Sequence, residues 1–212
     1  MQVQALDERS IRKSALLSSM QMEKAIPPLD VIRVLDSARI SFVLVGAYGL
    51  AGWRKESRAT EDVDVVVSAK QVKKAVKVLC EAFPYLEPVD LPVVVRLRDR
   101  ETQDIAIDVM KPLQQPYRDV FKHTHTVHSG DQKYRVPSLE MALVMKFSSM
   151  TSLYRANDDR HRDAQDFIRM AKRNPQLDTE KLADLGTLLY PDGGKDVLEM
   201  VRKALAGETL NI

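Results

Sequence analysis

Two aspartates stand two residues apart in a stretch that otherwise predicts a buried β-strand. Residues 58–67 read RATEDVDVVV, with Asp62 and Asp64 on either side of Val63. Because side chains alternate along a strand, both carboxylates are expected to face one side, opposite the valines that enter the core. Neighbouring carboxylates repel each other and raise each other's pKa unless a cation lies between them. The spacing favours a hard divalent cation such as Mg²⁺ or Mn²⁺, although D-x-D also occurs by chance on exposed strands.

A third acid is found in similar surroundings further along the chain. In DIAIDVM, residues 104–110, Asp108 falls on the face opposite Ile105, Ile107 and Val109. An acid between apolar neighbours on a central strand is unfavourable without a partner. Three carboxylates from two neighbouring strands would form a two-metal site, in which one ion activates the attacking oxygen and the other holds the leaving phosphate.

A glycine turn precedes the paired aspartates. Residues 41–53 read SFVLVGAYGLAGW, a short apolar strand that breaks at Gly46 into small residues. A strand that ends in glycine before a short helix lets backbone N–H groups approach phosphate oxygens. The turn alone is weak evidence, because many tight turns have this composition.

Taken in order, these features resemble the nucleotidyltransferase superfamily, and in particular its AbiEii-type toxin members. The family pattern is a hydrophobic residue, Gly, then Gly or Ser, a linker, D-h-D on a strand (h, hydrophobic) and a later Asp on another strand. It is matched by Val45-Gly46-Ala47, Asp62-Val63-Asp64 and Asp108, and RATEDVD is similar to the R-x-T-x-D-h-D form of stand-alone bacterial members. The resemblance covers roughly residues 29–173.

The resemblance implies a donor nucleoside triphosphate, a Mg²⁺ or Mn²⁺ cofactor and an acceptor hydroxyl on tRNA, a protein or a small molecule. It also implies an antitoxin protein as a partner. The metal ligands and catalytic residues would be the three aspartates, with Asp108 as third ligand or as base for the acceptor hydroxyl. The nucleotide would be bound with the help of Gly46, Ala47, Arg58 and Thr60.

Ala47 departs from the family pattern. Alanine keeps a backbone N–H but lacks the hydroxyl of serine and the conformational freedom of glycine. Weakened nucleotide binding, or a non-catalytic member that binds a nucleotide or a protein partner, is therefore an alternative. A metal-dependent nuclease or phosphohydrolase is a further alternative, but Val66 stands where nucleases of the P-D…E-x-K type need a lysine.

Two more charges lie on apolar helix faces in the second half of the chain. Lys146 falls within a stripe of leucine, alanine, phenylalanine and methionine, and Asp163 lies similarly on the next helix. A buried lysine needs an anion or a route to solvent, so the two residues could pair. In AbiEii-type members a helix lysine followed by a basic-Asp motif helps to complete the nucleotide site, and Lys146 with Arg162-Asp163 is similar to it. A triphosphate contact and a buried ion pair between helices are both open.

The surrounding pattern predicts an α/β (α+β) fold, with a nucleotidyltransferase-like mixed sheet flanked by helices and then a C-terminal helical cap. We expect an N-terminal arm at 1–28, a catalytic domain at 29–137 and a helical domain at 138–212. The predicted strands are 41–45, the strand that carries Asp62 and Asp64 and ends at Ser68, 93–98 and 104–110, followed by a hairpin around Ser129-Gly130. The predicted helices are 29–40, Ser68 to about Phe83, 138–154, 158–173, 178–189 and 193–206. Ser68 and Gln71 form a capping-box pattern at the start of the second of these helices. The proline-rich segment that contains Pro84, Pro88 and Pro92 predicts a loop.

The composition is ordinary for a globular protein. The 212 residues are 44% hydrophobic and 29% charged, with a net charge of +2, so bulk charge does not indicate nucleic-acid binding. Cys80 is the one cysteine and cannot form an internal disulfide. With no long apolar run and no apolar N-terminal segment, we expect a cytoplasmic protein that does not associate with membranes.

Three weaker features remain. His123, His125 and His128 could bind zinc or be exposed hairpin residues. Arg96, Arg98 and Arg100 alternate on a strand beside the proposed site, where they could bind an anionic acceptor such as RNA or protect a sheet edge. Trp53 and Cys80 are expected in the core.

Overall fold

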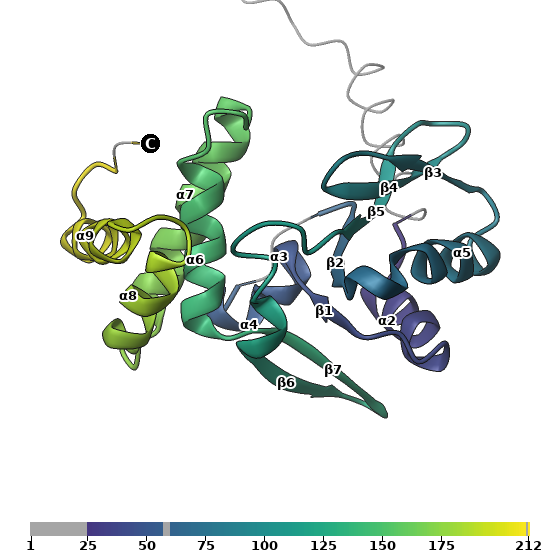
Figure 1. Cartoon of the computed structure of the whole chain (residues 1–212), viewed down its shortest axis with the longest axis horizontal. Helices are drawn as coiled ribbons and strands as arrows, with labels where there is room; N and C mark the ends of the chain where they lie inside the picture. Colours follow the sequence, from purple (N-terminus) through teal and green to yellow (C-terminus); the bar gives the residue numbers. More distant parts are fainter. Residues whose placement is uncertain (1–24, 57–59, 211) are drawn as a thin grey trace, which may run out of the picture.

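A five-stranded mixed sheet forms the centre of the first half of the chain. The computed structural model describes residues 25–56, 60–210 and 212. The strands follow the order β1-β2-β5-β4-β3, and among these neighbours only β2 and β5 run parallel (Figure 1). Their bounds are β1 Phe42–Leu44, β2 Val63–Val67, β3 Leu86–Asp90, β4 Val94–Asp99 and β5 Ile105–Met110. The mixed sheet flanked by helices confirms the predicted fold class.

Two helices pack together against the sheet. Helix α2 spans Pro28–Ser37, with proline in its first turn where no intrahelical N–H is lost, and α5 spans Val72–Ala82. Their apolar faces bury Leu35 and Leu79 with the inward valines of β2, such as Val63 and Val65. The alternation predicted for β2 is therefore confirmed: the valines beside Asp64 enter the core.

Strand β3 corrects one prediction. Residues 86–90 were expected in a loop because prolines surround them, yet they pair antiparallel with β4. β3 is an edge of the sheet, and an edge strand tolerates Pro88 because one side of the strand makes no ladder hydrogen bonds.

The predicted capping box at Ser68 is also wrong. Ser68 precedes a short 3₁₀ helix, η1 (Ala69–Gln71), and its side chain makes no capping hydrogen bond. Gln71 instead binds the segment before β1: its Oε1 accepts from the Ser41 N–H at 2.8 Å, and its Nε2 donates to the Arg39 carbonyl at 3.2 Å. A tertiary contact has taken the side chain that the local pattern assigned to a cap.

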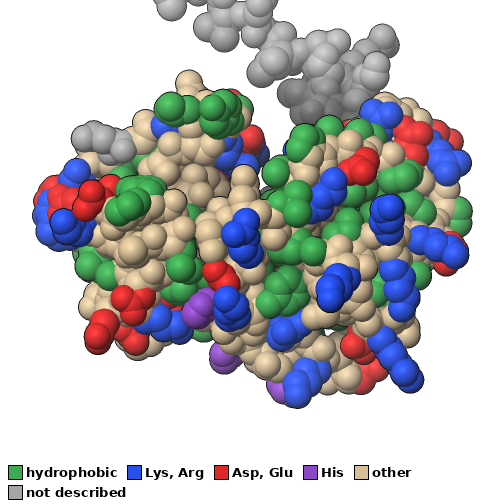
Figure 2. Space-filling view, viewed as in Figure 1, with side chains coloured by type: hydrophobic (Ala, Val, Ile, Leu, Met, Phe, Trp, Pro, Cys, Tyr) green, Lys and Arg blue, Asp and Glu red, His purple; other side chains and the backbone are tan. Residues whose placement is uncertain are grey.

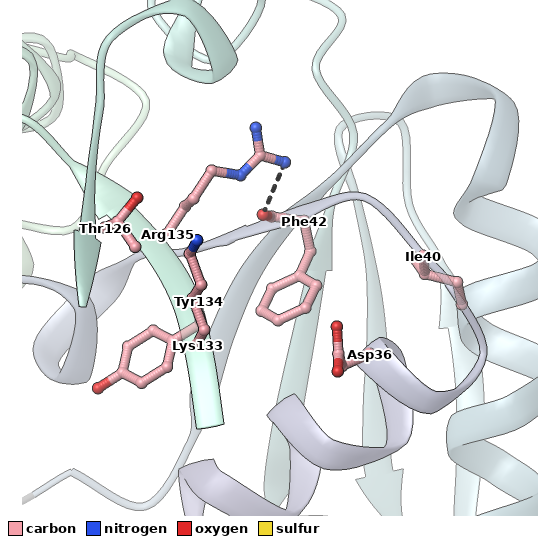
Figure 3. Close-up of a pocket in the computed structure, with 7 residues that line it drawn as sticks. All are labelled: Asp36, Ile40, Phe42, Thr126, Lys133, Tyr134 and Arg135. Atoms are coloured by element: carbon pink, nitrogen blue, oxygen red, sulfur yellow. Dashed lines mark hydrogen bonds between the residues drawn. The ribbon is translucent and has the colours of Figure 1, made fainter. Parts of the chain in front are cut away.

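The predicted hairpin is confirmed as β6 (Thr124–Ser129) and β7 (Gln132–Pro137), preceded by the 3₁₀ helix η2 (Val120–Lys122). Arg135 attaches the hairpin to β1, because its Nη2 donates to Ser41 Oγ at 2.8 Å and to the Phe42 carbonyl at 3.4 Å (Figure 3). A pocket lies at this junction, lined by Asp36, Ile40, Phe42, Thr126, Lys133, Tyr134 and Arg135. None of the predicted site residues lines it.

The second half of the chain is helical, as predicted. Its helices are α6 Leu139–Met150, α7 Asn157–Arg173, α8 Thr179–Thr187 and α9 Gly193–Ala206. Ser138 caps α6 by accepting from the Met141 N–H, and Asp178 caps α8 by accepting from the Lys181 N–H. Figure 1 shows α6 and α7 between the sheet and the outer helices α8 and α9.

The core of the helical half continues into the strand half. Val43, Val45, Leu50 and Val66 pack in the same apolar cluster as the buried residues of α6 and α7. The boundary near residue 137 stays a prediction, and residues 1–24 of the predicted arm lie outside the described residues. Within the part of the chain that the structure describes, no helix is both long and apolar enough to span a membrane.

Candidate active site

The three predicted carboxylates meet at one place on the sheet. Asp64 on β2 and Asp108 on β5 are directly opposite each other in the parallel pair, and Asp62 lies just before β2. Each is partly buried, and each offers a carboxylate oxygen within 4.8 Å of those of the other two. No other described residues form a group of three histidine, cysteine or acidic side chains placed for a metal ion. Strand register therefore achieves what D-x-D spacing alone could not guarantee.

The carboxylates perturb one another strongly. The pKa of Asp64 is raised to about 7: burial is the largest cause, the negative charges of Asp62 and Asp108 add to it, and Lys146 and Arg155 partly offset the rise. Burial likewise raises the pKa of Asp108 to about 6, against the lowering effect of Arg96. Groups held at these values repel as anions at neutral pH and would be stabilised by a cation between them.

The donor set fits a hard divalent cation. Asp108 Oδ1 is buried and accepts no hydrogen bond from any described residue; its nearest cationic partner is Arg96 Nε, 3.5 Å away. A buried carboxylate oxygen without a donor calls for a missing partner. Carboxylate oxygens are the ligands preferred by Mg²⁺ and Mn²⁺, so the residues present could hold such an ion.

The glycine turn lies against these carboxylates. Gly46 has φ +60°, and a Cβ on it would stand 1.8 Å from Asp64 Oδ2. The backbone joins the two segments as well, because the Val45 N–H donates to the Asp64 carbonyl at 2.9 Å. Only glycine fits here: it must adopt a left-handed conformation and leave room for the aspartate.

Ala47 opens no gap at the position where the family has glycine or serine. Ala47 is buried, with 4% of its surface exposed, and its carbonyl accepts a 2.7 Å hydrogen bond from Arg54 Nη2. Ala47 is the second residue of the short helix α3 (Gly46–Gly49), which is followed by the short helix α4 (Ala51–Arg54). A buried side chain leaves the backbone as the group that this position offers.

Thr60 lies beside one of the three carboxylates, and its contact with the nucleotide stays a prediction. Its Oγ1 donates to Asp62 Oδ1 at 2.6 Å, and its carbonyl accepts from the Tyr48 hydroxyl at 3.4 Å. Thr60 thus orients an acid. Arg58 lies outside the described residues.

The predicted pairing of Lys146 with Asp163 is confirmed. Lys146 Nζ lies 2.6 Å from Asp163 Oδ1 and 2.9 Å from Asp166 Oδ2. Arg155 Nε lies 2.6 Å from Asp163 Oδ2, and Arg54 Nη1 lies 3.0 Å from Asp166 Oδ1. These five residues form a chain of alternating charge, which we call the buried ion chain.

Sequence reasoning missed three members of the buried ion chain. Arg54 sits in the charge-rich run WRKESR and Arg155 in a loop, so neither interrupts an apolar pattern. Asp166 falls three residues after Asp163 on the same helix face, and this spacing was the one available signal.

Of the remaining charged candidates, Arg96 lies at the site, whereas Arg98 and Arg162 pair elsewhere. Arg98 pairs with Glu87 on the neighbouring strand at 2.7 Å, and a register shift after Leu97 breaks the arginine row, leaving Arg96 beside Asp108. Arg162 pairs with Asp159 on the exposed face of α7. Neither pairing involves the carboxylates of β2.

The tryptophan, cysteine and histidine candidates lie on other elements than the three carboxylates, and their contacts are with the rest of the fold. Trp53 is partly buried and donates from Nε1 to the Pro137 carbonyl at 2.9 Å, with His125 against its ring at 5.5 Å between centroids. Cys80 is partly buried against the strand-half core rather than fully enclosed. His123, His125 and His128 belong to no metal-like group among the described residues.

The chain is similar to several solved structures. The antibiotic-resistance factor ANT(2'')-Ia in complex with adenylyl-2''-tobramycin is 11% identical, with 73% of this chain and 90% of that chain covered and a TM-score of 0.52. Its solution structure is 8% identical, covers 85% of this chain and 96% of that chain, and has a TM-score of 0.50. An antigenic nucleotidyltransferase-like protein from Paracoccidioides brasiliensis is 22% identical over 81% of this chain and 88% of that chain, with a TM-score of 0.49. At these identities the two ANT(2'')-Ia structures show a similarity of fold alone.

The family follows from the sequence. The family model described as "Nucleotidyl transferase AbiEii toxin, Type IV TA system" matches residues 31–209. The chain therefore belongs to the AbiEii nucleotidyltransferase toxin family. Comparison with curated proteins gives no match.

Proposed function

We propose that this protein transfers a nucleoside monophosphate from a nucleoside triphosphate to an acceptor hydroxyl, with Mg²⁺ or Mn²⁺ bound by Asp62, Asp64 and Asp108. The observation that carries the proposal is the meeting of these three carboxylates, within 4.8 Å of one another, against a glycine with φ +60°. Membership of the AbiEii family supports nucleotidyl transfer as the type of reaction.

The two halves of the chain supply different parts of the site. The aspartates would hold the cation, which when bound offsets negative charge on the phosphates and lowers the barrier to attack at phosphorus. The turn at Gly46 and Ala47 would present backbone N–H groups to the phosphates. Lys146 and Arg155 lower the pKa of Asp64, so their positive field already reaches the place where the triphosphate would lie.

The reaction is an in-line displacement. The acceptor oxygen forms a bond to the α-phosphorus, the bond from that phosphorus to the α–β bridging oxygen breaks, and pyrophosphate leaves. The proton of the acceptor hydroxyl passes to a carboxylate, for which Asp108 is the candidate, or to water. We propose that Asp108 acts either as this base or as the third metal ligand.

The non-catalytic alternative rested on Ala47, and the buried position of that residue weakens it. If this position contributes only its backbone to nucleotide binding, the lack of a serine hydroxyl should reduce the affinity for the nucleotide little. We also propose a role as the toxin of a toxin–antitoxin pair, with an antitoxin protein as partner and tRNA, a protein or a small molecule as acceptor. A cytoplasmic location accords with this role.

Nucleotide binding tests the proposal before the acceptor is known. We would measure the melting temperature of wild type with ATP, GTP, CTP and UTP, each with and without Mg²⁺. A ligand at about 100 times its dissociation constant stabilises by about 2.7 kcal/mol, which for this size is roughly 5–10 °C. No Mg²⁺-dependent shift with any of the four would refute the proposal.

Asp108→Asn separates the two roles of Asp108. Loss of the shift assigns Asp108 to metal binding, whereas a retained shift with lost transfer of α-labelled nucleotide assigns it to proton transfer. The matched control is Asp104→Asn, an exposed aspartate at the start of the same segment, which should behave as wild type.

A further inference from the structure

Arg54 is a fully buried arginine beside the glycine turn. It is 1% exposed, and its two terminal nitrogens are used by different parts of the molecule. Nη2 donates to the Ala47 carbonyl at 2.7 Å, whereas Nη1 donates to Asp166 Oδ1 on α7 at 3.0 Å. One guanidinium therefore joins the turn to the helical half of the chain.

The buried ion chain extends this connection toward the carboxylates. From Asp166 it passes to Lys146, then to Asp163, and ends at Arg155, whose side chain is 44% exposed. Charges alternate along the chain, as buried ions require, because an unpaired ion in the interior costs several kcal/mol. The position of the turn is thereby linked to the cations that lower the pKa of Asp64.

Other contacts already attach α4 to α7. Asn174 Nδ2 donates to the Trp53 carbonyl at 2.7 Å, and Arg173 Nη1 donates to the Arg54 carbonyl at 2.7 Å. Arg173 also pairs with Glu56, as does Arg169 Nε at 3.6 Å. The backbone of α4 is thus attached to α7 without the Arg54 guanidinium, so this attachment does not explain why the guanidinium also donates to the turn.

The turn needs such support. Helix α3 has four residues, Gly46–Gly49, too few for a helix to be stable on hydrogen bonds of its own. A hydrogen bond to the Ala47 carbonyl fixes the plane of the peptide between Ala47 and Tyr48, because a peptide unit is rigid. Fixing that plane fixes the direction of the Tyr48 N–H, which points opposite to the carbonyl.

We propose that Arg54 is a positioning residue for nucleotide binding: it holds the Ala47 peptide in the orientation that the phosphates require and ties it to Asp166. This inference rests on the proposed function and adds to it a residue that does not itself touch the nucleotide. A positioning role and a purely structural role predict different effects when Arg54 is replaced. Nucleotide binding should suffer, while the metal-binding carboxylates should not.

The test compares two ligands on one variant. Arg54→Lys keeps the charge, but an ammonium replaces the planar fork that reaches two acceptors. We would measure the affinity for Mn²⁺ alone, by paramagnetic resonance, and for the α,β-methylene analogues of ATP, GTP, CTP and UTP with Mg²⁺, by calorimetry. Arg54→Lys should weaken binding of the preferred analogue at least tenfold and change Mn²⁺ affinity less than twofold.

The matched control is Arg169→Lys, the same exchange at the α4–α7 contact but away from the turn, and it should leave both affinities unchanged. If Arg54→Lys binds the analogue as wild type does, or loses Mn²⁺ and analogue together, the inference is wrong. Should Arg54→Lys fail to fold, Arg54→Gln with Asp166→Asn removes one charge of each sign and should show the same split. Failure of wild type to bind any analogue would instead refute the proposed function, and the inference with it.

Discussion

Removal of the Asp64 charge should stabilise the metal-free protein. The pKa of Asp64 is raised from 3.8 to about 7, mainly because burial disfavours the anion. A carboxyl group with a higher pKa in the folded state favours folding while it is protonated. Its favourable effect is complete below pH 4, declines as the pH rises, and is lost once the pH exceeds about 7. At pH 8 the ionised Asp64 is therefore a cost to the fold that Asp64→Asn removes.

The size of the effect follows from the shift. About three pKa units at about 1.4 kcal/mol each set an upper value near 4 kcal/mol. Since the side chain keeps some exposure to water, we expect about 2–4 kcal/mol, or roughly 5–15 °C in melting temperature for a chain of this size. At pH 4 the variant and wild type should differ little, because Asp64 is then protonated.

Melting curves at pH 4, 6 and 8 in the presence of a chelator would measure this. At pH 8 with chelator, Asp64→Asn should melt at a higher temperature than wild type. Added Mg²⁺ should stabilise wild type but not the variant, so the difference in melting temperature should shrink or change sign. Asp184→Asn, at an exposed position of α8, is the control and should change neither result. A variant that melts below wild type at pH 8 without metal would show that Asp64 is a satisfied structural group, and the reasoning would be wrong.

Two further substitutions test the parts around the carboxylates. Gly46→Ala would place a Cβ 1.8 Å from Asp64 Oδ2, so we expect at least about 3 kcal/mol of destabilisation and loss of Mn²⁺ binding in melting and resonance measurements. Gly130→Ala has the same φ of +60° but no neighbour within 4 Å, and should cost only about 1–2 kcal/mol; equal effects at both would refute the packing argument. Thr60→Val removes the donor to Asp62 and should weaken Mn²⁺ about tenfold, while Thr60→Ser should restore it; unchanged affinity in Thr60→Val would show that this hydrogen bond does not orient the ligand.

The sequence predicted the cluster of three carboxylates because their constraints are local. Alternation along a strand puts Asp62 and Asp64 on one face, and an acid among apolar residues at Asp108 predicts a partner. What the pattern could not supply is register: Asp64 stands opposite Asp108 only because β2 and β5 run parallel without a slip. A shift by one residue would have turned Asp108 to the other face of the sheet.

The errors and omissions arise where distant residues compete for a local group. Gln71 looked like part of a helix cap, but the chain before β1 offers it a donor and an acceptor. Pro88 indicated a loop, and the edge position of β3 removes the penalty on which that prediction relied. The burial of Arg54 could not be predicted from the sequence. One of its partners, Asp166, is far away along the chain, and the other is a backbone carbonyl, that of Ala47, which no residue pattern marks.

The proposed site draws on both halves of the chain, and this bears on the predicted boundary near residue 137. The strand half contributes the carboxylates and the glycine turn, whereas α6 and α7 contribute Lys146, Asp163 and Asp166. Val45 and Leu50, on either side of the turn, are buried in the cluster that the helices complete. A fragment that ends at 137 would expose that apolar surface and deprive Arg54 of its carboxylate partner, Asp166. We therefore expect the helical cap to be part of the catalytic unit: its removal should weaken nucleotide binding even though the three proposed metal ligands lie before the cut.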